Sequence, residues 1–127
     1  MQYVGDYHVL AHVETPEFSM LLLSLGEEDY VAPHYHDHSK QLYAVLEGVI
    51  EVTSGDRSFR LRPYGTTQIE RHTVHDLRPV TGRALVVSIC TPPLDLEDQH
   101  TVVQIPARPV TRSAPALSGR FQPVGGR

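Results

Sequence analysis

The sequence predicts an all-β domain, a sandwich or a barrel of short strands. Apolar runs of four to nine residues are separated by turn signals at intervals of about 8 to 12 residues, which is typical of such folds. No stretch of 11 or more residues has a convincing helical period of apolar positions. The 127 residues are enough for one domain with a core and too few for two.

The expected strands follow one another along most of the chain. In chain order they are residues 7–13, 18–25, 41–46, 49–53, 58–62, 66–69 and 83–91. Glu47-Gly48 is a hairpin signal between the third and the fourth strand. Pro92-Pro93 ends the last one, and residues 94–99 favour a single helical turn. We therefore expect one domain over residues 1–105.

Residues 106–127 differ in composition from the rest of the chain. They contain four prolines, three glycines and four arginines and no acid, which predicts a poorly ordered or peripherally docked tail. The other 105 residues carry seven basic and fifteen acidic side chains, a net charge of −8. An acidic body argues against nucleic acid as a partner.

Three further features concern the compartment. No apolar run approaches the roughly 18 to 20 residues that span a bilayer, so no membrane partner is expected. The N-terminus has no basic segment followed by an apolar stretch, as a secretory signal would have. Cys90 is the single cysteine, so an intramolecular disulfide is excluded. A cytoplasmic protein is expected.

The candidate site lies in the segment from residue 34 to residue 48, HYHDHSKQLYAVLEG. His34, His36 and His38 alternate, and alternate side chains of a strand share a face. Imidazole is the commonest metal ligand near neutral pH. Gln41 is expected to begin the next inward-facing set, together with Tyr43 and Val45. A further ligand should come from elsewhere, and His75 is the best candidate.

This segment resembles the first motif of the cupin superfamily, which is His-x-His, three or four residues, Glu, six residues and Gly. Here four residues separate His36 from Gln41 and six separate Gln41 from Gly48, so the spacing selects His34 and His36 and not His38. Residues 61–75 resemble the second motif, which ends at a ligand histidine, here His75. That motif is degenerate in this chain, since Thr66 stands where an acid usually follows the glycine.

The resemblance covers roughly residues 18–92 and carries implications for fold and site. It implies a cupin double-stranded β-helix, which is an antiparallel jelly-roll barrel. It also implies one divalent transition metal ion, Fe, Mn, Ni or Zn, in the barrel. The implied metal ligands are His34, His36, Gln41 and His75.

Gln41 stands where the motif has glutamate. A neutral ligand leaves the charge of a site around a divalent ion near +2 rather than +1, which weakens cation binding and favours an anionic ligand. Small cupins that linearise unsaturated uronates have a similar histidine and glutamine arrangement. Their usual acid, aromatic and arginine after the last strand are missing here, so that activity is not carried over. Alternatively, Gln41 orients a histidine from outside the metal's own ligands.

Two functions are compatible with these residues. The first is a metal-dependent cupin enzyme acting on a small polar or anionic organic molecule, by oxygenase, isomerase or lyase and cyclase chemistry. Tyr43 is its candidate general acid or base, unless it is simply a packed tyrosine. The second is a non-catalytic binding or sensing cupin, similar to the barrel of arabinose-regulator-type transcription factors. A metal-free structural cupin is a third, weaker possibility.

The N-terminal strand predicts self-association. Residues 7–13 have apolar side chains on both faces, and an unpaired strand edge of this kind is a liability. Small cupins usually pair through barrel faces and exchanged N-terminal strands. We therefore expect a homodimer.

Overall fold

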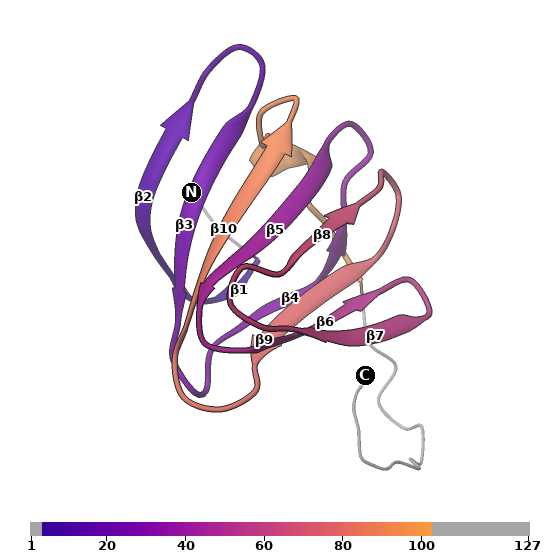
Figure 1. The fold of residues 1–127 in the computed structure, drawn as a ribbon. Coiled ribbons are helices and arrows are strands. Elements are labelled where there is room, and N and C mark those ends of the chain that lie inside the picture. Colours follow the sequence, from indigo (N-terminus) through magenta and orange to yellow (C-terminus); the bar gives the residue numbers. More distant parts are fainter. Residues whose placement is uncertain (1–3, 103–127) are drawn as a thin grey trace.

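The computed structural model describes residues 4–102, which form two antiparallel sheets (Figure 1). The first sheet contains, in spatial order, β1 (Gly5–Asp6), β4 (Tyr30–Tyr35), β9 (His75–Pro79), β6 (Ile50–Ser54) and β7 (Arg57–Leu61), with β11 (His100–Thr101) also paired to β4. The second contains β2 (His8–Glu14), β3 (Ser19–Leu25), β10 (Ala84–Thr91), β5 (Lys40–Glu47) and β8 (Thr66–Ile69). A short 3-10 helix, η1 (Leu96–Asp98), precedes β11. The predicted antiparallel jelly-roll barrel is confirmed, while the predicted tail, residues 106–127, lies outside the described residues.

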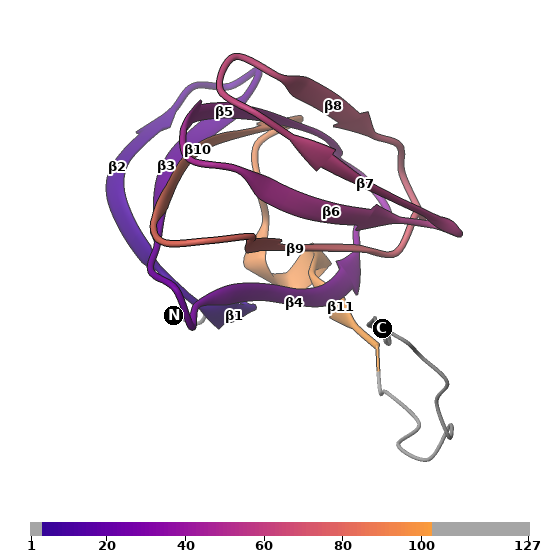
Figure 2. The ribbon, with the colours of Figure 1, turned by 60° about the horizontal axis from the view of Figure 1, so that its bottom comes forward.

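The two sheets enclose a common interior, as Figure 2 shows along the barrel. Burial alternates along β3, β5 and β10, so every second side chain points inward. On β5 the inward side chains are Gln41, Tyr43 and Val45, as expected. Gln41 lies opposite Cys90 of β10, and Val45 lies opposite Val86. The interior therefore changes from polar to apolar along the barrel.

The turn at Glu47-Gly48 corrects a prediction. It is not a hairpin, because β5 pairs with β10 and β8 whereas β6 pairs with β7 and β9. It carries the chain from one sheet to the other. Gly48 has φ +84°, and a Cβ there would lie 2.4 Å from the carbonyl oxygen of Arg83, so only glycine fits.

Four strands were absent from the sequence-based prediction as strands of their own: the two-residue strands β1 and β11, and the longer β4 and β9. β4 contains Pro33 and β9 ends at Pro79, and proline weakens a strand signal because it cannot donate to the ladder. These two strands pair with each other and place His34 directly opposite His75. The predicted helical turn over residues 94–99 is present as the shorter η1. In the part of the chain described, no helix is long and apolar enough to cross a bilayer.

Candidate metal centre

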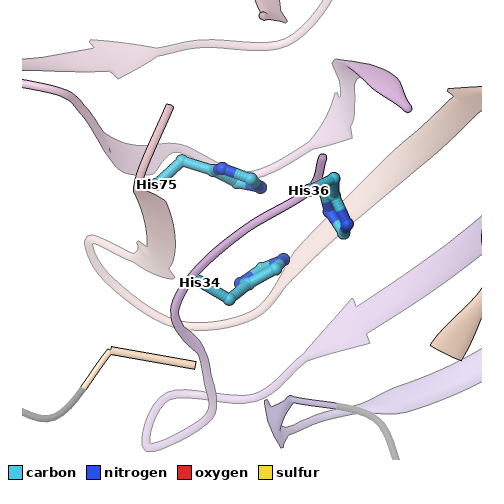
Figure 3. A group of neighbouring side chains, drawn as sticks. All are labelled: His34, His36 and His75. Atoms are coloured by element: carbon cyan, nitrogen blue, oxygen red, sulfur yellow. The ribbon is translucent and has the colours of Figure 1, made fainter. Parts of the chain in front are cut away.

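Three of the predicted histidines meet inside the barrel. His34 lies on β4, His36 follows the end of that strand, and His75 begins β9. All three are buried, and their nearest possible ligand atoms lie within 4.8 Å of one another (Figure 3). This group is placed for a metal ion. His38 is exposed and lies outside the group, because the strand ends at Tyr35 and the alternation of faces is lost beyond it.

Hydrogen bonds set the tautomer of each imidazole in the group. Every Nδ1 lies against a backbone carbonyl oxygen: His34 against Ala32 at 2.7 Å, His36 against Asp98 at 3.0 Å, and His75 against Thr73 at 2.8 Å. A carbonyl oxygen only accepts, so each Nδ1 carries the proton and donates it. Each Nε2 therefore keeps its lone pair, which is the form in which histidine binds a metal.

Gln41 completes the ring of donor atoms. Its Oε1 lies 2.7 Å from Nε2 of His75 and 3.2 Å from Nε2 of His36, and its amide nitrogen donates to Ser88 Oγ at 2.7 Å. In this arrangement Oε1 and both Nε2 atoms present lone pairs to one another with no proton between them. A cation at their centre would satisfy all of them, so the donor set fits a divalent transition metal.

Burial keeps two of the imidazoles, those of His34 and His75, neutral. It lowers the pKa of His34 to about 4, against a weaker opposing effect of the hydrogen bond to Ala32. Burial also holds the pKa of His75 well below its usual value, and the neighbouring His34 adds to this. At neutral pH these two ligand candidates have no proton that a metal must displace from Nε2.

Tyr43 lies in the interior close to this group. Its ring centroid is 6.1 Å from that of His75, and the side chain is 1% exposed. Among the described residues its hydroxyl has no hydrogen-bond partner. Burial raises the pKa of Tyr43 well above its usual value, so the hydroxyl stays protonated. The two predicted roles, general acid and general base, stay predictions; a hydroxyl that keeps its proton can donate a hydrogen bond.

Two residues next to the histidine group were not singled out from the sequence. Ser88 interrupts the apolar run of β10 at an inward-facing position, and that interruption was the available signal. Asp98 is buried, and its carboxylate accepts backbone N–H groups of Asp37 and His38 at 2.9 and 3.0 Å. Burial acts to raise the pKa of the Asp98 carboxyl, but these hydrogen bonds lower it overall. No feature of the local sequence predicts the contact between Asp98 and His36.

The two-sheet barrel with a histidine group inside is the fold of the cupins. It is similar to KdgF from Halomonas sp., with TM-score 0.64, 22% identity, and coverage of 73% of this chain and 83% of that one. The protein TT1209 from Thermus thermophilus gives TM-score 0.64 and 19% identity over 74% and 91% of the two chains. A cupin superfamily protein from Desulfitobacterium hafniense gives a TM-score of 0.61 and 19% identity, and the match covers 72% of this chain and 82% of that one. No family model and no curated protein matches the sequence.

Proposed function

We propose that the protein is a metal-dependent cupin enzyme that acts on a small polar or anionic organic molecule. The observation that carries the proposal is the convergence of three buried Nε2 lone pairs and the Gln41 oxygen. His34, His36, His75 and Gln41 would hold one divalent ion, Fe, Mn, Ni or Zn. When bound, the ion would act as a Lewis acid on a substrate oxygen. The fold does not select among oxygenase, isomerase and lyase or cyclase chemistry.

The surrounding residues have separate tasks in this proposal. The backbone carbonyls at Nδ1 fix the three ring orientations, and Ser88 orients the Gln41 amide. Tyr43 would donate a hydrogen bond from its hydroxyl to a substrate atom, since that hydroxyl has no hydrogen-bond partner among the described residues. Because all four ligand candidates are neutral, the loaded site would keep a charge near +2 and attract an anionic group.

One observation favours the second function, a binding or sensing cupin. Within residues 4–102 the buried carboxylate is Asp98, and it is already held by two backbone N–H groups. Asp98 is therefore not free to act as a general base. The two functions separate in one experiment: small carboxylic acids that stabilise the metal-loaded protein are incubated with it and analysed by mass spectrometry. A new product supports the enzyme, whereas stable, unchanged ligand supports the sensor.

Changing Gln41 to glutamate tests whether Gln41 binds the metal as a neutral ligand. The added negative charge lies at coordination distance from the ion, so Gln41→Glu should bind a divalent metal at least as tightly as the wild type. The same charge should weaken the binding of an anion such as malonate. Calorimetric titration with metal and then with the anion measures both. Weaker metal binding, or equal anion binding in the two proteins, would show that Gln41 is not a ligand.

The outer face of the second sheet supports the proposed homodimer. An antiparallel sheet with one face in water normally alternates apolar and polar side chains. Here the central outward side chains are also apolar: Met20, Leu22, Leu42, Leu85, Val87 and Ile89. None of these side chains is charged, so this face can meet its own copy about a two-fold axis without like-charge repulsion. β2 pairs with β3 of its own chain, and the sheet face is the contact we propose between the two copies.

A charge on that face should separate the subunits. Val87 lies at the centre of the face, opposite Leu22 and Ala44. Val87→Glu would place two carboxylates in an apolar interface, so we expect a folded monomer where the wild type is a dimer. Light scattering gives the mass and circular dichroism checks the fold. Thr53→Lys, which places a charge on the outer face of the other sheet, should remain dimeric. A monomeric wild type would contradict the proposal.

A further inference from the structure

A second cluster of donor atoms lies beside His36, outside the histidine group. It is formed by Asp37 after β4, Asp98 of η1 and His100 of β11. Nε2 of His100 lies 3.1 Å from Oδ2 of Asp37 and 3.3 Å from Oδ1 of Asp98. We propose that these three side chains form a second site for a divalent transition cation such as Zn²⁺. It shares no ligand with the first site and does not depend on the proposed function.

The donor atoms suit such an ion. Two carboxylates face one imidazole nitrogen, which carries at most one proton and can give it fully to only one of them. A divalent cation in place of that proton would bind all three atoms and offset both negative charges. Nitrogen and oxygen ligands at 2.0–2.2 Å from Zn²⁺ in a tetrahedron lie roughly 3.3 Å apart. Both distances from Nε2 of His100, 3.1 and 3.3 Å, are close to this spacing.

Each ligand is also held by an outer partner, as ligands of built metal sites are. The Asp98 carboxylate accepts the backbone N–H groups of Asp37 and His38. The ring of His100 stacks on Tyr35 at 5.0 Å with an interplanar angle of 29°. His72 Nδ1 lies 3.0 Å from Oδ1 of Asp37, which leaves Oδ2 facing His100. The ligands thus come from two segments distant in sequence, around Asp37 and at residues 98–100, and His72 supports them from a third.

An ion at this point would fix a segment that supports the first site. The backbone carbonyl oxygen of Asp98 accepts a hydrogen bond from Nδ1 of His36. In addition, β11 pairs with β4 opposite Tyr35 and His34. The second ion would join this segment to the turn after β4. We therefore expect it to restrict opening of residues 95–102 as well as to bind.

Metal stoichiometry tests the proposal. The full chain is dialysed against excess Zn²⁺ and the bound metal is measured. We expect two ions in the wild type, one in Asp37→Asn, one in His100→Ala, one in His75→Ala and none in the double variant His75→Ala/His100→Ala. His12→Ala is the matched control, because His12 also lies near an acid, Glu14 at 3.5 Å, but on the exposed β2. It should bind two.

The outcomes separate the two sites. A single ion that is lost in His75→Ala overturns the second site and leaves the first intact. A single ion that is retained in His75→Ala and lost in His100→Ala supports the second site and removes the first. Hydrogen exchange gives an independent measurement: Zn²⁺ should slow amide exchange in residues 95–102 of the wild type and of His75→Ala, but not of His100→Ala. A second ion that leaves this exchange unchanged lies elsewhere and overturns the proposal.

Discussion

Replacing His75 by alanine is expected to abolish the binding of a divalent transition metal in the barrel. His75 supplies one Nε2 of the buried group and lies 2.7 Å from Oε1 of Gln41. Its loss removes one ligand and the contact that holds the Gln41 oxygen at the centre. The affinity should fall by more than the roughly 10- to 100-fold that loss of an outer partner of a ligand costs. His36→Ala should have the same effect on this site.

Metal content after reconstitution with Mn, Fe, Co, Ni and Zn measures this result. His38→Ala is the matched control, since His38 belongs to the same segment but is exposed. It should bind metal as the wild type does. Calorimetry separates the barrel ion from any ion bound at Asp37, Asp98 and His100. A wild type that stays empty with all five metals would contradict the metal centre itself.

The metal-free protein is expected to lose stability in mild acid. Burial lowers the pKa of His34 from 6.5 to about 4 in the folded state. Between these two values the unfolded chain binds a proton at His34 that the folded chain does not, so stability falls as the pH falls. The contribution is fully present above pH 6.5 and is lost progressively down to about pH 4. For His34 alone this amounts to about 3 kcal/mol.

His75 acts in the same direction, because its pKa is also lowered by burial. Asp98 contributes in a more acidic range, since its pKa is lowered from 3.8. Urea unfolding at several pH values in this range gives the slope of the free energy of unfolding against pH. His34→Gln, which removes the titrating imidazole, should show a smaller slope, and His12→Ala an unchanged one. Equal stability of the wild type at both ends of the range would contradict the lowered pKa, because His34 would then take up its proton in the folded protein as it does in the unfolded chain.

The sequence was sufficient where the period of a strand persists. Alternation along residues 41–45 placed Gln41, Tyr43 and Val45 in the interior, and all three are buried. It did not separate His36 from His38, because the strand ends before them and only the spacing to Gln41 made the distinction. The spacing and the second motif also selected His75, although β9 itself had no clear strand signal.

Long-range pairing accounts for what the sequence did not predict. A glycine with positive φ is equally typical of a hairpin and of a connection between two sheets, and the pairing of β5 with β10 decides between them at Gly48. Asp98 reaches the site across about sixty positions, through backbone groups of residues 36–38 that carry no sequence signal. Ser88 contacts Gln41 across 47 positions.

The contact with Ser88 allows the Gln41 amide two orientations that differ only by a rotation of the side chain. A hydroxyl can donate or accept, so Ser88 can bond either end of the Gln41 amide. With the amide turned over, its two N–H groups would reach the Nε2 lone pairs of His36 and His75, and Ser88 would donate to the oxygen. Glutamate in that position would have to take up a proton to do the same. Gln41 can therefore change between this orientation and the ligand orientation seen in the structure by rotation alone, with no proton taken up or released.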